Sequence, residues 1–367
     1  MSNKKIAIIG ASYLQLPLIA KAKELGYETH VFAWKREDVG EKEADYFYPI
    51  SITEKEKILN ICKQIRINGV CSIASDMAVI TVNYVAEKLG LIGNSIHSSQ
   101  ICTNKFLMRK QFWHNNDPVP KFLLYTDEEN IEGIEYPVIV KPVDRSGSRG
   151  VTKVNNVVEL KHAICIAKKE SFCNQALIEE YVEGREYSAE YLSYRGKHYF
   201  IAITTKYTTG FPNFIETGHS EPSDLDADKI KNIQRIIEHA LDTLEIQNGA
   251  SHSEFKIDKD GRVKIIEIGS RMGGDCIGSD LVPLTTGIDY VRAVIQIACG
   301  DIPNMTPCEH RCKAKVVYIL TREDLEQFYK IKNESSDRIL KVFDFHPEKI
   351  GNVTDSSNRA GGYIVRL

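Results

Sequence analysis

The sequence lacks two kinds of signal that would direct a chain to or through a membrane. No apolar run in its 367 residues is long enough to span a bilayer, and the opening MSNKKIAIIG has no signal-peptide cleavage pattern. It also lacks a marked excess of either charge, because the formal net charge is −3. Such a balance favours neither nucleic acid nor an anionic membrane as a partner. We therefore expect a cytoplasmic protein with reduced thiols, no nucleic-acid partner and no membrane partner.

Several common site motifs are absent as well. The nine cysteines are scattered, and no second ligand cluster follows Cys308 and Cys312 in CEHRC, so we expect unligated thiols there. The loop GASYLQ, which begins at Gly10, has only the first glycine of the GxGxxG fingerprint, and DRSGSRGV does not match GxxxxGK[ST]. These absences disfavour a dinucleotide site and a Walker P-loop. The sequence has no internal repeat.

The N-terminal part alternates short apolar strands with amphipathic helices. Strands are expected at Lys5–Gly10, Glu28–Trp34 and Gly69–Asp76, and helices near 54–67 and 78–89. This alternation predicts a parallel sheet with helices on both faces. Ligands of such sheets bind beyond the carboxyl ends of the strands, which makes the loops after Gly10 and Ala74 candidate site loops. Plain turn formation is the alternative for both loops.

Two acidic strand positions form the clearest candidate metal site. Glu254 lies in HSEFKID and Glu267 in KIIEIG, and the turn DKDGR joins these segments into a predicted β-hairpin. Alternation places Glu254 on the face of His252, and Glu267 on the face of Ile265 and Gly269. If the two faces coincide, both carboxylates converge beside Arg271, an arrangement that suits Mg²⁺ carrying a nucleoside triphosphate. Solvated glutamates on an amphipathic hairpin are the alternative.

A glycine- and serine-rich loop and two lysines suggest phosphate binding. In DRSGSRGV, Gly147 and Gly150 let the backbone approach an anion, and the neighbouring serines add donors. Lys141 lies in the apolar segment YPVIVKP, where a buried lysine needs an anionic partner. Lys105 follows the strand-like segment SQICTN. A mobile connection and surface lysines are the alternative readings.

The ordered set of these segments resembles the ATP-grasp superfamily. NKFLMR, YPVIVKP, GSRGV, LIEEYVEGREYS and EFKIDKDGRVKIIEIGSRMGG follow one another as in carboxylate–amine ligases such as D-alanine–D-alanine ligase, biotin carboxylase and carbamoyl phosphate synthetase. The resemblance implies an α/β protein with an N-terminal parallel-sheet domain (1–102), an α+β ATP-grasp domain (103–300) and a C-terminal α/β segment (301–367). Within the ATP-grasp domain, residues of about 120–183 would form the lid subdomain and 184–300 the metal and substrate subdomain, with the nucleotide between them.

The resemblance also implies a role for each motif residue. Lys105 and Lys141 would contact the phosphates of ATP, and Arg271 would stabilise the transferring phosphoryl group. Glu254 and Glu267 would bridge two Mg²⁺ ions, for which Mn²⁺ is an alternative. The remaining nucleotide contacts would come from the lid loop, the adenine pocket and the ribose site: Ser146, Gly147 and Ser148; Glu179, Glu180, Tyr181 and Val182; and Glu186.

The substrate pocket is expected between the N-terminal domain and the segment after Glu267. Its far wall would include Gln15, Ser75 and Asp76, and its near wall Arg271, Gly273, Gly274 and Cys276. His219 in TGHSEP would touch the substrate or act as a base, with a structural hydrogen-bonding role as the alternative. One departure from the family concerns Gly269, where many members carry an asparagine metal ligand.

The resemblance implies an ATP-dependent ligase. It would activate a small carboxylate, with an amino acid as the favoured donor, to an acyl phosphate and join it to an amine, releasing ADP and phosphate. Two alternatives remain at this point: a bicarbonate-activating enzyme of the carboxylase or carbamoyl phosphate synthetase type, and a non-catalytic nucleotide-binding sensor or scaffold. Related ligases are often homodimers, so a homodimer is a further expectation.

Overall fold

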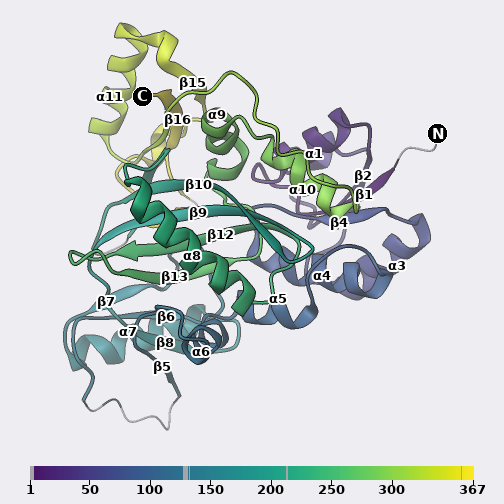
Figure 1. Cartoon of the computed structure of the whole chain (residues 1–367). Helices are drawn as coiled ribbons and strands as arrows, with labels where there is room; N and C mark the ends of the chain where they lie inside the picture. Colours follow the sequence, from purple (N-terminus) through teal and green to yellow (C-terminus); the bar gives the residue numbers. More distant parts are fainter. Residues whose placement is uncertain (1–3, 127–130, 132, 212–213, 357) are drawn as a thin grey trace.

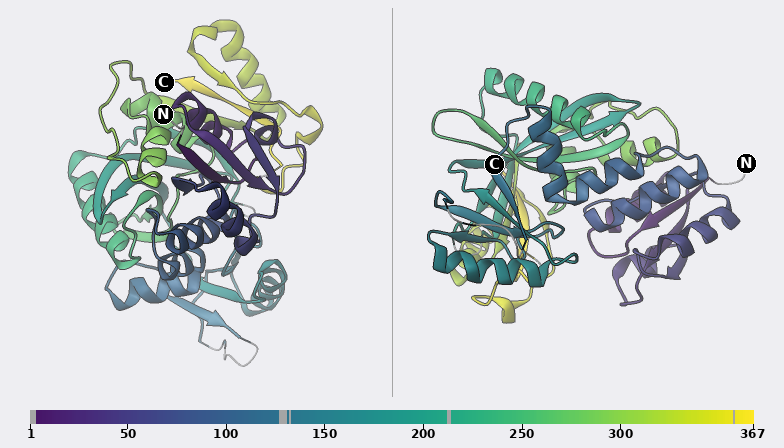
Figure 2. Two further views of the ribbon diagram at one scale, coloured as in Figure 1. Left: turned by 90° about the vertical axis from the view of Figure 1, so that its right-hand side faces the viewer. Right: turned by 90° about the horizontal axis from the view of Figure 1, so that it is seen from below.

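A computed structural model describes residues 4–126, 131, 133–211, 214–356 and 358–367. The described residues form three sheets, of four, eight and four strands. Figure 1 shows the large sheet in the middle of the molecule, with the small sheet of β5 to β8 beneath it and the N-terminal domain at one side. Figure 2 shows the same three parts from two further directions.

The N-terminal sheet is parallel throughout, as the alternation of strands and helices predicts. Its strand order is β3-β2-β1-β4. The strands are β1 (Lys5–Ile9), β2 (Glu28–Ala33), β3 (Tyr46–Pro49) and β4 (Gly69–Cys71), and the helices are α1 (Leu16–Glu24), α2 (Val39–Glu43), α3 (Lys55–Ile65) and α4 (Asp76–Leu89). Ser75 caps α4 by accepting a hydrogen bond from the Ala78 N–H. The carboxyl ends of β1 and β4 therefore both open toward the rest of the chain.

Two short helices connect this domain to the next. The strand-like prediction for SQICTN is wrong, because these residues belong to α5 (Ile96–Thr103) and its end. Ser95 caps α5, and the Asn104 side chain accepts from the N–H groups of Phe106 and Leu107 to begin α6 (Lys105–His114). The caps at both helix starts outweigh the strand propensity of Ile101 and Thr103. Lys105 is consequently the first residue of a helix.

The strands of the small sheet all lie within residues of about 120–183, the range predicted for the lid subdomain. Its strands follow the order β5-β8-β6-β7, and all its pairings are antiparallel. They are β5 (Phe122–Tyr125), β6 (Val138–Pro142), β7 (Thr152–Val154) and β8 (Ala176–Glu180), with α7 (Val157–Glu170) packed on one face. Lys141 lies on β6, opposite Leu177 of β8.

The large sheet contains strands from both the central and the C-terminal parts of the chain. Its order is β13-β12-β9-β10-β11-β14-β16-β15, antiparallel throughout. The strands are β9 (Arg185–Tyr194), β10 (Lys197–Thr208), β11 (Glu216–Glu221), β12 (Gly249–Ile257), β13 (Val263–Gly269), β14 (Ala314–Ile319), β15 (Ile339–Val342) and β16 (Gly361–Arg366). The segment after residue 300 thus extends the sheet of the preceding domain instead of forming a sheet of its own.

The other helices pack around this sheet. They are α8 (Ala227–Thr243), the π-helix Ile277–Leu281, α9 (Val282–Thr286), α10 (Tyr290–Ala298), α11 (Arg322–Glu334), and the 3₁₀ turns Ser336–Arg338 and Pro347–Lys349. The buried stripe of α8, with Ile233 and Ile237, packs against Tyr187, Phe255 and Ile265 of the sheet. Figure 1 shows α8 lying across these strands. This apolar layer leaves the opposite face of β9, β10, β12 and β13 for polar residues. Within the described residues, no helix combines the length and apolar character that a bilayer crossing needs.

One buried carboxyl makes stability depend on pH. Glu221 on β11 is fully buried and accepts hydrogen bonds from the Thr204 and Thr285 hydroxyls. Burial raises its pKa to about 7. The folded state therefore keeps a proton that the unfolded chain releases between its ordinary pKa of about 4.5 and pH 7, so Glu221 makes the protein less stable as pH rises through this window.

We expect Glu221→Gln to remove this dependence, because the amide stays neutral. Relative to wild type, the variant should gain on the order of 2 kcal/mol of unfolding free energy between pH 5 and pH 8, since one pKa unit corresponds to about 1.4 kcal/mol. Urea denaturation at both pH values measures this, with the exposed Glu326→Gln as a control. Parallel pH profiles for wild type and Glu221→Gln would contradict the assignment.

Candidate active site

Strand alternation gathers the charged residues on one face of four neighbouring strands. Glu254 on β12 lies directly opposite Glu267 on β13, so the two carboxylates share a face. β9 is the other neighbour of β12 in the sheet, and its Glu190 lies opposite His252. All of these residues face away from α8 and its apolar contacts. Together with the small sheet they bound a cleft lined by Asp76, Lys105, Lys141, Arg145, Ser146, Gly147, Ser148, Glu179, Glu180, Tyr181, Val182, Glu186, Glu216, His252, Glu254, Lys256, Ile266, Glu267, Gly269 and Arg271.

A β-bulge corrects one detail of the predicted hairpin. The register shifts between Glu254 and Phe255, because Phe255 pairs with Ile265 and Ile266 is the extra residue. Ile265 is buried in the core with α8, whereas Ile266 and Glu267 line the cleft. Ile265 and Glu267 therefore do not share a face, contrary to the prediction from simple alternation.

A buried lysine that the sequence motifs did not reveal organises one side of the cleft. Lys206 on β10 lies 2.8 Å from Glu254 and 3.1 Å from Glu186. Burial opposes its charge, but Glu254 and Glu186 raise its pKa well above the usual value. Its place in the apolar strand segment FIAITTKYT was the available signal, since a lysine on a buried strand needs an anionic partner. Glu186, the predicted ribose ligand, is thus held by Lys206.

His252 fixes Glu254 from the other direction. One ring nitrogen contacts Glu190, and the other lies 3.2 Å from an oxygen of Glu254. Burial opposes protonation, but Glu190 and Glu254 raise the pKa of His252 to about 9, so the ring is charged at neutral pH. Burial alone would raise the pKa of Glu254, whereas Lys206 and His252 hold it well below its ordinary value. Glu254 is therefore ionised and positioned by two cations.

On the small-sheet side, one carboxylate serves two cations. Glu179 forms an ion pair with Lys141 and another, of 2.5 Å, with Arg109 of α6. Arg109 is fully buried and also donates to the Ile266 carbonyl. Burial would raise the pKa of Glu179, but Arg109 and Lys141 hold it below its usual value, and burial lowers that of Lys141. This cluster carries one excess positive charge, which favours an anion in the cleft.

The sequence pattern missed Arg109, and it assigned Glu179 to the adenine pocket. The structure places Glu179 among the cleft-lining residues, with its carboxylate occupied by the two cations. Arg109 lies four residues after Lys105 on the same face of α6. That spacing was the available signal, although a single arginine on a helix usually reads as a surface residue.

Lys105 and the glycine-serine loop meet at the mouth of the cleft. Lys105 lies 2.8 Å from Glu267 and donates a hydrogen bond to the Arg145 carbonyl. Ser146, Gly147 and Ser148 line the cleft, and the Ser148 hydroxyl donates to the Phe214 carbonyl at 3.4 Å. The loop therefore contacts α6 and the connection between β10 and β11.

The predicted adenine-pocket residues at and after the end of β8 also lie in the cleft. Glu180, Tyr181 and Val182 all line it. The Glu180 N–H donates to the Lys121 carbonyl at 2.9 Å, so this donor is already used within the protein. Lys256 donates to the Val182 carbonyl at 3.4 Å and fixes the end of the segment to β12.

The structure explains why residue 269 is a glycine. The Arg271 guanidinium pairs with Asp76, whose position at the start of α4 brings it to the end of β13. A Cβ added to Gly269 would lie 3.0 Å from Asp76 Oδ1 and 3.0 Å from Arg271 Cζ. The ion pair therefore fills the space that an asparagine side chain would use. Burial opposes ionisation of Asp76, but Arg271 lowers its pKa.

His219 lies outside this cleft. It is buried on β11, its Nε2 is 3.6 Å from Asp275, and its ring meets Tyr318 edge-on. The predicted wall residues Gly273, Gly274 and Cys276 also lie with Asp275, on a neighbouring cavity. The residues predicted to line the substrate pocket are thus divided between the cleft, which includes Arg271, and an adjacent cavity, which includes Gly273, Gly274 and Cys276.

The donors of the cleft fit a divalent cation that arrives with phosphates. Glu254 and Glu267 are hard oxygen ligands on opposite strands, and each now faces an ammonium group, Lys206 and Lys105 respectively. In the part of the chain that the structure describes, no group of three or more His, Cys, Asp or Glu residues could hold a metal. Mg²⁺ is commonly held by one or two carboxylates together with water and substrate phosphates. The residues fit that mode and not an all-protein cage.

We expect Gly269→Asn to destabilise the protein, even though it introduces the asparagine that many family members carry. The new side chain would displace the Asp76–Arg271 pair, at a cost of about 1–3 kcal/mol in unfolding free energy. Chemical denaturation measures this. Lys259→Asn, at an exposed position of the turn between β12 and β13, is the control. Equal stability of the two variants would contradict the packing argument.

Comparisons with known proteins agree with this geometry. The family model of the ATP-grasp domain matches residues 134–279. The alanine–anticapsin ligase of Bacillus subtilis (strain 168) is 26% identical over 314 residues, covering 74% of this chain and 65% of that protein. A D-alanine–D-alanine ligase of Thermosipho africanus is 27% identical over 201 residues, covering 49% of this chain and 53% of the relative. The chain thus spans about two thirds or less of the length of these curated relatives.

Solved structures share the fold over nearly the whole chain. An L-amino acid ligase from Bacillus licheniformis has a TM-score of 0.83 at 24% identity, covering 99% of this chain and 93% of that one. A phosphoribosylglycinamide synthetase from Anaerococcus prevotii has a TM-score of 0.77 at 22% identity, covering 100% and 94%. The domain match identifies an ATP-grasp domain at residues 134–279, and the chain as a whole shares the fold of these solved structures.

Proposed function

We propose that this protein is an ATP-dependent ligase that activates a small carboxylate as an acyl phosphate and joins it to an amine. The observation that carries the proposal is the cleft itself. Lys105 and Lys141 lie on one side, and the facing carboxylates Glu254 and Glu267 lie on the other. A cleft with cations for phosphates and two oxygen ligands for their counter-ion is suited to phosphoryl transfer.

Each charged group then has a chemical task. Lys141, with Arg109 behind it, supplies positive charge for the α- and β-phosphates, and Lys105 would exchange Glu267 for the same phosphates. Bound Mg²⁺, held by Glu254 and Glu267, would neutralise the charge of the transferring phosphoryl group. We propose two such ions, as the resemblance implies. His252 and Lys206 keep Glu254 ionised and oriented for this role.

Arg271 is the group suited to the substrate carboxylate. Asp76 holds its Nε and Nη2, whereas Nη1 is buried without a hydrogen-bond partner in the described structure. A buried donor without a partner is costly, so this atom is ready for an anionic oxygen. The carboxylate attacks the γ-phosphorus, ADP leaves, and the amine then attacks the acyl carbon and expels phosphate. Because acyl phosphates hydrolyse readily, closure of the loop at Ser146–Ser148 would exclude water.

The relatives favour an amino acid as the carboxylate. The names alanine–anticapsin ligase, D-alanine–D-alanine ligase and L-amino acid ligase all describe ligation of amino acids. We therefore propose an amino acid donor for this chain too. A biotin carboxylase domain among the structural neighbours is described as a dimer, and we propose a homodimer here on that analogy.

The test is interception of the acyl phosphate. With ATP, Mg²⁺, hydroxylamine and a panel of amino acids, we expect one hydroxamate to form for each ADP released. Glu267→Gln should lower kcat/KM for this reaction about 100-fold or more, since loss of one charge-stabilising contact in a transition state typically costs about 10²–10³ in rate. Glu326→Gln, on the exposed surface of α11, is the matched control.

Other outcomes separate the alternatives. ADP release that depends on bicarbonate and gives no hydroxamate with any amino acid would favour a bicarbonate-activating enzyme. Tight ATP binding without ADP release for any carboxylate would favour a nucleotide-binding sensor or scaffold. Either result would overturn the ligase assignment.

A further inference from the structure

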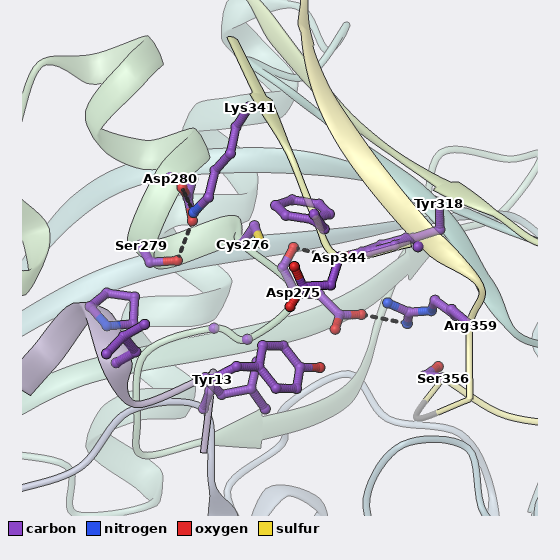
Figure 3. Close-up of a pocket in the computed structure, with 18 of the residues that line it drawn as sticks. Tyr13, Asp275, Cys276, Ser279, Asp280, Tyr318, Lys341, Asp344, Ser356 and Arg359 are labelled. Atoms are coloured by element: carbon purple, nitrogen blue, oxygen red, sulfur yellow. Dashed lines mark hydrogen bonds and ion pairs between the residues drawn. The ribbon is translucent and has the colours of Figure 1, made fainter. Parts of the chain in front are cut away.

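A second cavity, of about 400 Å³, adjoins the nucleotide cleft. Three parts of the chain form its walls: the loop and helix after β1, with Tyr13; the segment after β13, with Met272; and the C-terminal segment, with Phe343 and Arg359. Figure 3 shows residues of these three parts pointing toward one another across the cavity. The family match ends at residue 279, so the C-terminal wall lies outside the matched domain.

The cavity and the cleft are adjacent. Arg271 lines the cleft, and the next residue, Met272, lines the cavity. On another side, Glu216 lines the cleft and lies 3.2 Å from Arg359 of the cavity. A substrate whose carboxylate lies at Arg271 can therefore extend its remaining atoms into the cavity.

The charges that line the cavity are largely neutralised within the protein. Arg359 pairs with Asp275 at 2.7 Å, and its guanidinium lies 3.8 Å from the Tyr318 ring centroid. Lys341 pairs with Asp280 at 2.7 Å. These pairs join the C-terminal segment to the residues after β13 and neutralise four of the charged groups of the lining. The other acidic and basic side chains of the lining, Asp344, His346 and Lys349, all belong to the C-terminal segment.

The remaining lining is mainly apolar. It includes Tyr13, Leu14, Leu16, Pro17, Ile73, Ala74, Met272, Tyr318, Val342 and Phe343. Tyr13 is 66% exposed, an unusual state for an aromatic ring at the rim of an apolar cavity. Such a lining is suited to an uncharged, apolar group.

Backbone strain at the wall supports a binding role. Ala74, Asp275 and Cys276 have φ angles of +56°, +50° and +62°, and all three line this cavity. Left-handed conformations of residues other than glycine cost roughly 1–3 kcal/mol each and cluster at ligand sites. The Ala74 N–H donates to the Met272 carbonyl at 3.2 Å, so the two strained loops are held against each other.

We propose that this cavity binds the side chain of the carboxylate donor, and that the donor is an amino acid with a bulky, uncharged, apolar side chain. The proposal rests on the ligase function proposed above. A water molecule occupies about 30 Å³ of the liquid, so bicarbonate or glycine would leave most of the cavity unfilled. Phe343 of the C-terminal segment and Tyr13 of the N-terminal domain contact this side chain and set the preference.

The experiment compares donors in the hydroxamate reaction. Wild type should give a higher kcat/KM with leucine, methionine or phenylalanine than with glycine, aspartate or lysine. Phe343→Ala and Tyr13→Ala should each change the phenylalanine-to-glycine ratio of kcat/KM about tenfold or more, the scale on which apolar pockets discriminate. Tyr329→Ala is the matched control, because Tyr329 is an exposed tyrosine of α11 that does not line the cavity. It should leave the ratio unchanged.

Binding is measured separately from turnover by calorimetry of each amino acid with the protein and a non-hydrolysable ATP analogue. Weaker binding of phenylalanine to Tyr13→Ala and Phe343→Ala would support the cavity even if no donor gave a hydroxamate, a result that would overturn only the ligase function. A preference for glycine or charged donors would overturn the cavity proposal. Variants that change selectivity for the amine, with the donor ratio unchanged, would overturn it too. Circular dichroism of Tyr13→Ala checks the fold, since this exposed ring has little packing to lose.

Discussion

The pairing of β12 with β9 and β13 is the constraint on which the rest of the site depends. Because side chains alternate along each strand, one register places aromatic and aliphatic residues against α8 and the acids and bases on the opposite face. A one-residue slip would exchange the two faces, which the apolar core forbids. The same burial that stabilises the fold therefore fixes Glu254 opposite Glu267, and the bulge at Ile266 adjusts the second strand so that Glu267 faces the cleft.

Charged side chains in such a cleft need partners, and those of this protein form ion pairs with one another. Glu179 faces both Lys141 and Arg109, Glu267 faces Lys105, and Glu254 faces Lys206 and His252. Under the function proposed above, binding of a nucleotide with its counter-ion would exchange several of these contacts, with the lysines turning to phosphate and the carboxylates to the cation. Pairing within the protein keeps the groups ionised and ordered before the ligand arrives, which lowers the reorganisation that catalysis would otherwise require.

The C-terminal segment gains a function from its place in the large sheet. β14 and β16 continue the sheet beyond β11, and the loop between β15 and β16 then returns over the segment that follows Arg271. Ion pairs from Arg359 and Lys341 attach it to Asp275 and Asp280. The cleft proposed for phosphoryl transfer and the cavity proposed to bind the substrate side chain are thus formed by segments that are separate in sequence but adjacent in the structure. Such a division lets substrate preference change while the nucleotide site is retained.

The sequence by itself determined the features that depend on local periodicity and turn chemistry. These include the parallel N-terminal sheet, the β12–β13 hairpin with its Asp258–Arg262 turn, and helix α8, whereas the burial of Lys141 in YPVIVKP was left open until the structure was known. Only the tertiary structure decided the pairing of Arg109 with Glu179, the place of Lys206 between two glutamates, and the filling of the space at Gly269 by Asp76 and Arg271. Each of these joins residues far apart in the chain, so no local pattern encodes it. Helix α5 and the bulge at Ile266 show the same limit at short range, because capping and core packing outweighed strand propensity and simple alternation.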